Sequence, residues 1–319
     1  MGRSVCKLVV QKVRAVHSAV QPHPFRTWQN APIFPDCGGR CGGKIRNKAG
    51  IVVTDSETKS ALILGASSGF GEAAAGAFAG AGYDIFGVHL DRRAGIQKVE
   101  KITGVIEDAG QTAVFFNVNA ASADKRDHVL DTMAETAEPG AVRVLLHSLA
   151  FGTLAPFTGS GRAMTTDQMN MTLDVMAHTL VYWTQGLISR GLMGDGGRIY
   201  AMTSSGGDRV IPTYGAVSAA KAALESHCRQ LALELAPLGI TANAIRAGVT
   251  DTPALRKIPG AAHMMEEQRA QNPHGRLGKP EDVAGCLVAL AMPETHWMTG
   301  NTIRVDGGED FIGSRPPAG

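Results

Sequence analysis

The chain reads Ile63-Leu64-Gly65-Ala66-Ser67-Ser68-Gly69-Phe70-Gly71-Glu72, with three glycines between an apolar strand-like run and a helical stretch of small residues. Gly65 allows the chain to turn sharply off the strand, Gly69 allows the backbone to approach a pyrophosphate, and Gly71 allows the helix to pack close to the sheet. The first backbone N–H groups of such a helix face an anion. The segment therefore predicts a dinucleotide-binding turn.

This turn opens a long alternation of strand-like and helical patterns. Apolar strand-like runs are Ala61–Leu64, Tyr83–Val88, Ala113–Phe116, Val142–Leu146, Arg198–Met202, Thr241–Ile245 and Thr302–Val305. Helical patterns are Gly71–Ala81, Ala94–Ala109, Ala123–Ala137, Met164–Leu192, Thr213–Leu238 and Pro280–Ala291. Buried strands that alternate with amphipathic helices imply a parallel sheet with helices on both faces. Residues 57–313 are predicted to form a single Rossmann-like, doubly wound α/β domain with about seven strands.

Composition argues against several classes of function. The 319 residues are 44% hydrophobic and 19% charged, which is ordinary for a soluble globular protein. The net charge of +2 gives no electrostatic basis for nucleic-acid binding, and no apolar run is long enough to span a bilayer. The five cysteines show no disulfide framework, so a reducing, cytoplasmic location is expected. Cys37 and Cys41 form a CxxxC pair, but zinc would need two further ligands, and no metal site is predicted.

The first 56 residues differ from the rest of the chain. Between Met1 and Thr54 there are nine Lys or Arg residues and one acid, Asp36. Organellar transit peptides are also Arg-rich and acid-poor, but here serines are scarce and the middle is rich in Pro, Gly and Cys. We expect residues 1–56 to be a disordered basic extension and residues 314–319 a short tail. Organellar import is the less favoured alternative.

The choice of dinucleotide is predicted from the residues after the second strand, His89-Leu90-Asp91-Arg92-Arg93. An acid at this place binds the adenosine ribose hydroxyls and favours NADH, whereas arginine binds a 2′-phosphate and favours NADPH. Asp91 supplies the first feature, and Arg92 and Arg93 supply the second. Because an arginine fork fits a phosphate, NADPH is the favoured prediction and NADH the alternative.

A tyrosine and a lysine mark the candidate catalytic helix. Tyr214 and Lys221 are seven residues apart, which is nearly two helical turns, so both side chains can lie on one face. A nearby ammonium favours the phenolate and lowers the pKa of tyrosine. The lysine can also hold the nicotinamide ribose. Alternatively, Tyr214 caps the helix and Lys221 is a surface charge.

Residues 60–312 resemble the short-chain dehydrogenase/reductase superfamily. The resemblance rests on the glycine-rich turn, the region around Ser204, the Tyr–Lys helix, Asn243-Ala244-Ile245-Arg246-Ala247-Gly248 and Val305-Asp306-Gly307-Gly308. Most members place the tyrosine four residues before the lysine, a position that Val217 occupies here. The longer spacing resembles the enoyl-acyl-carrier-protein reductases. Their pattern is also similar in Leu146-His147-Ser148-Leu149-Ala150-Phe151 and, for the NADPH-using type III branch, in Gly248-Val249-Thr250-Asp251-Thr252-Pro253-Ala254-Leu255.

The resemblance implies a homotetramer or homodimer that reduces the carbon–carbon double bond of an enoyl thioester carried by acyl carrier protein or coenzyme A. It places catalytic roles on Tyr214, Lys221 and Ser204, and substrate contacts on Tyr214, Phe151 and Gly152. Implied cofactor contacts are Gly65, Ser67, Ser68, Gly69, Phe70, Gly71, Asp91, Arg92, Arg93, Asn119, Ala120, Ser148, Leu149, Ala150, Lys221, Gly248, Thr250 and Thr252.

The chemistry gives an independent reason for the longer spacing. In an enoyl thioester, hydride goes to the β-carbon and charge develops on an oxygen further along the substrate, so moving the tyrosine by one turn suits that oxyanion. Ser204 matches the catalytic serine of other members, so a carbonyl or alcohol oxidoreductase, such as a 3-oxoacyl reductase, is a rival interpretation. Asp174 takes the place of the usual catalytic asparagine, which argues against that proton relay. A non-catalytic, cofactor-sensing regulator is a third interpretation.

Overall fold

The computed structural model describes residues 45–46, 52–53, 58–159 and 163–312. Two short strands, β1 (Ile45–Arg46) and β2 (Val52–Val53), pair antiparallel within the predicted N-terminal extension. The rest of that extension and the predicted tail, residues 314–319, lie outside the described residues.

A seven-stranded parallel sheet forms the centre of the domain. Its strands are β3 (Ser60–Leu64), β4 (Asp84–His89), β5 (Ala113–Asn117), β6 (Val142–His147), β7 (Arg198–Ser204), β8 (Thr241–Ala247) and β9 (Thr302–Val305). Their order is β5-β4-β3-β6-β7-β8-β9, and every neighbouring pair is parallel. The predicted doubly wound sheet is thereby confirmed.

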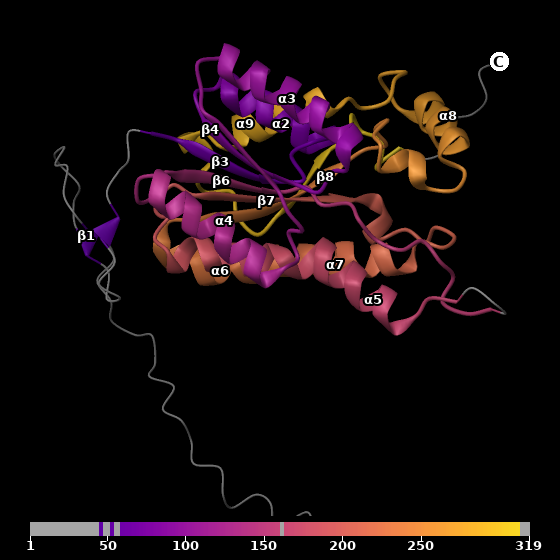
Figure 1. Ribbon diagram of the computed structural model, residues 1–319. Coiled ribbons are helices and arrows are strands. Elements are labelled where there is room, and N and C mark those ends of the chain that lie inside the picture. The colour runs from indigo at the N-terminus through magenta and orange to yellow at the C-terminus, as the bar shows by residue number, and fades with distance from the viewer. Residues whose placement is uncertain (1–44, 47–51, 54–57, 160–162, 313–319) are drawn as a thin grey trace, which may run out of the picture. The chain divides into compact units, whose positions relative to one another are not determined.

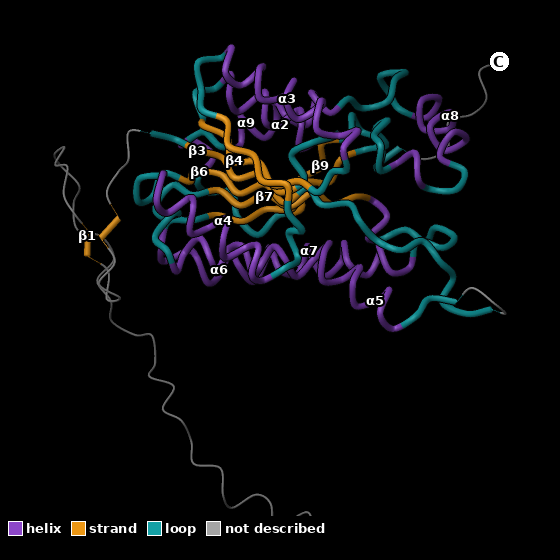
Figure 2. The backbone as a smooth tube through the Cα atoms, in the orientation of Figure 1, coloured by secondary structure: helices purple, strands orange, loops and turns teal. Residues whose placement is uncertain are grey.

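Helices cover both faces of the sheet (Figures 1 and 2). One face carries α2 (Gly69–Gly80), α3 (Arg93–Asp108) and α9 (Pro280–Leu290), and the other carries α4 (Ala123–Thr136), α6 (Thr179–Ser189) and α7 (Gly215–Leu235). Side chains alternate along β3, so Ala61 and Ile63 join the core under α2, α3 and α9. Leu62 and Leu64 join the other core, together with Trp183.

Two helical regions differ from the sequence-based prediction. The expected helix Met164–Leu192 consists of α5 (Thr166–Leu173), a π-helical turn η1 (Asp174–His178) and α6. The helix α8 (Ala261–Gln271) was not predicted, because only Ala261 of its residues is buried and no apolar stripe marks it. Short 3₁₀ turns are η2 (Ser205–Gly207), η3 (Ala236–Leu238), η4 (Leu255–Lys257) and η5 (Pro293–Thr295).

Candidate active site

A cavity of about 240 Å³ opens at the carboxyl edge of the sheet, where the strand order reverses between β3 and β6. Ligands bind at such a switch point in open α/β sheets. The loops after β3, β6, β7 and β8 line it together with the start of α7. Sequence-predicted site residues on its wall are Ser68, Gly69, Phe70, Ser148, Leu149, Ala150, Gly152, Ser204, Tyr214, Lys221, Gly248, Thr250 and Thr252.

The glycine-rich turn fits a dinucleotide phosphate. Gly65 has φ +90°, and an added Cβ there would lie 2.4 Å from Ser148 O, so only glycine is tolerated. A Cβ on Gly71 would lie 2.1 Å from Gly65 O, because the first turn of α2 packs directly on the turn backbone. Ser68, at the N-cap of α2, makes no capping hydrogen bond with its side chain. The first N–H groups of α2 therefore remain available to an anion beside the cavity.

The tyrosine is held beside a serine. Tyr214 directly precedes α7, and its side chain makes no capping bond, which argues against the alternative that it only caps the helix. Burial raises the pKa of Tyr214. Ser204 Oγ is buried, and no hydrogen-bond partner reaches it from the described residues. Gly206 lies against both groups, since an added Cβ would be 2.5 Å from Tyr214 Cε1 and 3.3 Å from Ser204 Oγ.

Backbone strain precedes the tyrosine. Thr213 has φ +64° and is the one non-glycine residue with positive φ in the described part of the chain. A β-branched residue is disfavoured in this region, and such strain is concentrated at functional sites. Thr213 Oγ1 is buried without a hydrogen-bond partner among the described residues. Sequence patterns carry no signal for this conformation.

The lysine is buried, which excludes the alternative that it is a surface charge. Lys221 Nζ donates to Met202 O at 2.6 Å. Burial lowers the pKa of Lys221 to about 8, and the charge of Glu225 opposes this shift. Contrary to the expectation that an ammonium acidifies the phenol, burial is the dominant influence on Tyr214, and the shift is upward. Lys221 retains N–H donors for a ligand beyond the one bound to Met202.

An apolar wall faces the tyrosine. Met176, in the π-helical turn, and Val217, in α7, both line the cavity. A Cβ on Gly152 would lie 2.9 Å from each of their side chains, so the wall is closely packed at this point. Asp174, expected in place of the usual asparagine, lies away from the cavity. Met176 is therefore the residue that reaches the site from this helix, and it can relay no proton.

His147 is a packing group. It is fully buried at the end of β6, and its Nε2 lies 2.8 Å from Thr179 Oγ1. Thr179 donates its own hydrogen to Val175 O, so the imidazole Nε2 donates to Thr179. Burial lowers the pKa of His147 to about 3, with a smaller contribution from Lys221. The imidazole is therefore neutral at ordinary pH.

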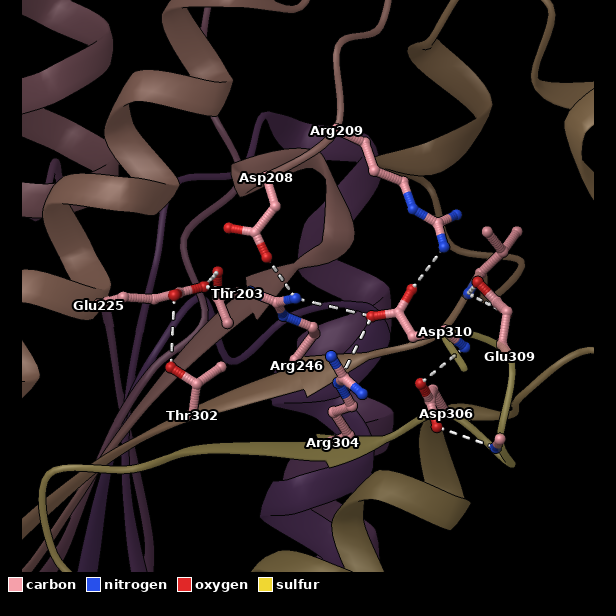
Figure 3. Close-up of polar contacts among 12 residues, drawn as sticks. Thr203, Asp208, Arg209, Glu225, Arg246, Thr302, Arg304, Asp306, Glu309 and Asp310 are labelled. Carbon is pink, nitrogen blue, oxygen red and sulfur yellow. Dashed lines mark hydrogen bonds and ion pairs between the residues drawn. The ribbon is translucent and has the colours of Figure 1, made fainter. Parts of the chain in front are cut away.

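A charged network braces the loops behind the cavity (Figure 3). The buried guanidinium of Arg246 contacts Asp208 at 2.6 Å, Glu225 at 3.3 Å and Asp310 at 3.6 Å. The carboxylate of Glu309 accepts a hydrogen bond of 2.9 Å from Val249 N, which lies in the cavity wall. The segment after β9 therefore holds the loop after β8 in place.

Several predicted residues do not line the cavity. Asn119 Oδ1 accepts from Ala121 N, and Ala120 O accepts from Trp183 Nε1. Phe151, expected at the substrate, is 63% exposed and does not line the cavity. Other predicted cofactor contacts that do not line the cavity are Gly65, Ser67, Gly71, Asp91, Arg92 and Arg93. The side chain of Arg93 lies outside the described part of the chain.

Within residues 58–159 and 163–312, no three His, Cys, Asp or Glu side chains are grouped to hold a metal ion. No helix in the described part of the chain has the length and apolar character needed to cross a membrane.

Comparison with known proteins places this site in a family. Residues 65–309 match the family described as Enoyl-(Acyl carrier protein) reductase. The enoyl-acyl-carrier-protein reductase (NADH) FabI of Aquifex aeolicus is 31% identical over 174 residues, 54% of this chain and 64% of that protein, so the match spans just under two thirds of the relative. The NADPH-dependent aldehyde reductase-like protein, chloroplastic, of Arabidopsis thaliana is 30% identical over 260 residues, 78% of this chain and 93% of that protein.

The structural comparison agrees. The crystal structure of the Aquifex aeolicus VF5 enoyl-acyl-carrier-protein reductase (NADH) has a TM-score of 0.69 at 26% identity, covering 81% of this chain and 98% of that chain. Fold and site thus define an oxidoreductase of the short-chain dehydrogenase/reductase superfamily. Within it, the chain belongs to the enoyl-(acyl carrier protein) reductase family. The names of the relatives divide between NADH and NADPH, so the prediction that NADPH is favoured is not supported.

Proposed function

We propose that the chain reduces the carbon–carbon double bond of an enoyl thioester with a nicotinamide dinucleotide as hydride donor. The observation that carries this proposal is the arrangement of Tyr214 and Val217 on the cavity wall. Val217, four residues before Lys221, is apolar, and Tyr214 lies about one helical turn further from the lysine. A phenol displaced in this way suits an oxyanion that is displaced from the carbon that accepts hydride.

The residues of the chain then have distinct tasks. When bound, the dinucleotide supplies the hydride, which adds to the β-carbon of the thioester. Tyr214 donates a hydrogen bond to the enolate oxygen, where charge develops, and the unpartnered Ser204 hydroxyl assists it. Addition of a proton at the α-carbon completes the reduction. Lys221, anchored on Met202 O, offers its other N–H bonds to the nicotinamide ribose.

The cavity wall is suited to an acyl chain. Leu154, Met176 and Val217 face the cavity, and a thioether side chain adapts its shape to different apolar ligands. The carrier of the acyl group, either acyl carrier protein or coenzyme A, and assembly into a homotetramer or homodimer remain predictions.

Steady-state assays test the reaction. Oxidation of NADH and NADPH is followed with crotonyl and longer enoyl thioesters of coenzyme A and of acyl carrier protein, beside β-ketoacyl thioesters. Loss of an oxyanion donor costs about a hundred- to a thousandfold in kcat, and Tyr214→Phe should show this loss on enoyl substrates with little change in cofactor affinity. Full enoyl activity of Tyr214→Phe would exclude the proposed mechanism.

A carbonyl reductase is the second candidate, and Ser204 is the observation that favours it. Its buried hydroxyl lies in the cavity wall without a partner, ready to bind a carbonyl oxygen. That function requires ketones or aldehydes to turn over and Ser204→Ala to be as harmful as Tyr214→Phe. A cofactor-sensing regulator, the third interpretation, would show dinucleotide binding with no turnover of either substrate class.

A further inference from the structure

Asp91 is held at the carboxyl edge of the sheet, just beyond β4. Its backbone makes two reciprocal hydrogen bonds with Asn117 on β5: Asp91 N donates to Asn117 Oδ1 at 3.0 Å, and Asn117 Nδ2 donates to Asp91 O at 2.9 Å. The glycine-rich turn is joined to the same strand, because Gly65 N and Ala66 N donate to Val88 O. Asp91 therefore lies in a fixed position one strand away from the turn that fits a pyrophosphate.

The carboxylate of Asp91 is oriented by His89. His89 Nδ1 lies 2.9 Å from Asp91 Oδ2, and since a carboxylate only accepts, the imidazole nitrogen donates. The His89 side chain is 5% exposed, whereas that of Asp91 is 28% exposed. One carboxylate oxygen is thus bound from the protein side, and the group keeps acceptor capacity toward solvent.

Two glycines make room for this pair. A Cβ on Gly87 would lie 2.5 Å from the ring of Phe115, and that ring packs near the His89 imidazole with 6.1 Å between centroids. A Cβ on Gly95, in the first turn of α3, would lie 2.7 Å from Asp91 Oδ1. The His89 ring is therefore packed beside Phe115, and the Asp91 carboxylate lies against the first turn of α3.

We propose that His89 is a positioning residue that makes this chain select NADH over NADPH, an inference that rests on the proposed function in requiring a nicotinamide dinucleotide. The oriented carboxylate accepts hydrogen bonds from adenosine ribose hydroxyls. A 2′-phosphate would bring negative charge against Asp91, and because His89 holds the carboxylate, it cannot turn away. Arg92 is exposed, and within the described part of the chain no ion pair fixes its guanidinium beside Asp91.

Binding measurements without a thioester test the proposal. Dissociation constants for NADH and NADPH are measured by isothermal titration calorimetry on the full chain. The natural chain should bind NADH at least about tenfold more tightly than NADPH. His89→Phe keeps a ring against Phe115 but removes the hydrogen-bond donor to Asp91. It should weaken NADH binding about tenfold, so that the dissociation constants for NADH and NADPH become more alike. His89→Gln, which restores a donor, should recover most of the discrimination.

Two more variants provide a test that does not depend on whether His89→Phe folds. Asp91→Asn removes the charge at constant size and should strengthen NADPH binding about tenfold, whereas Lys101→Ala, which removes an exposed charge on α3, should change either dissociation constant by less than about twofold. Equal binding of both dinucleotides by the natural chain, or an unchanged ratio in His89→Phe and Asp91→Asn, would overturn the proposal. An enzyme that reduces enoyl thioesters with NADPH alone would overturn this inference and leave the proposed function standing.

Discussion

Replacement of Gly206 by alanine should impair catalysis by displacing the Tyr214 ring. The added Cβ would lie 2.5 Å from Tyr214 Cε1 and 3.2 Å from Cδ1. Because carbon atoms approach to about 3.5 Å at the closest comfortable contact, the ring must move by about 1 Å. A misplacement of this size can cost about a hundredfold in rate, or about 2.7 kcal/mol of transition-state stabilisation. Cofactor affinity should change little.

The neighbouring glycine is the matched control. A Cβ on Gly207 would lie 3.5 Å from Lys221 Cβ, which is an ordinary contact, so Gly207→Ala should keep most of the activity. Steady-state kcat and NADH dissociation constants are measured for both variants. In a Tyr214→Phe background, Gly206→Ala should add almost nothing, because both changes remove the same interaction. Near-normal kcat in Gly206→Ala, or an equal loss in Gly207→Ala, would refute the reasoning.

Three further predictions concern ionisable groups. Because Lys221, with a pKa of about 8, loses its charge as the pH rises, NADH affinity in fluorescence titrations should fall about tenfold between pH 7 and 9; a flat profile would contradict this. Burial holds the pKa of His147 at about 3, so below pH 6.5 only the unfolded chain takes up this proton. Urea unfolding should lose about 2 kcal/mol from this group by pH 5, and His147→Gln should lack that loss. Arg246→Met leaves Glu225 buried without its cation and should lower the free energy of unfolding in urea by about 3–5 kcal/mol. Arg304 is more exposed, so Arg304→Met should lower it by less than about 1 kcal/mol. Similar losses in the two variants would count against a role for burial.

The strands of the parallel sheet and the helix that carries Lys221 could be predicted because their signals are local. Runs such as Val142–Leu146 are mostly apolar, as strands covered on both faces must be, and each strand of the seven-stranded sheet was placed to within two residues. Tyr214 and Lys221 were predicted from their spacing, and both line the cavity. The π-helical turn at Asp174–His178 was not found, because an inserted residue leaves the apolar pattern of the flanking helices intact.

Other parts of the site depend on tertiary approach. Gly206 contacts Tyr214 and Met176 contacts Gly152 only because separate loops meet at the sheet edge. The preference for NADPH was drawn from the two arginines after β4, whereas the structure shows Asp91 oriented by His89. The order of residues in the sequence does not show that the side chain of His89 orients that of Asp91.

The shallow packing of α8 has a consequence for local stability. α8 buries one residue, Ala261, whereas α7 buries ten. Opening of α8 exposes little apolar surface, so its backbone amides should exchange with deuterated solvent by local opening. The backbone amides of α7 should exchange only when the whole domain unfolds. Met264 lines the cavity from α8, so we expect part of the cavity wall to open independently of α7. We therefore expect the part of the cavity wall on α8 to open at a much lower free-energy cost than the part on α7.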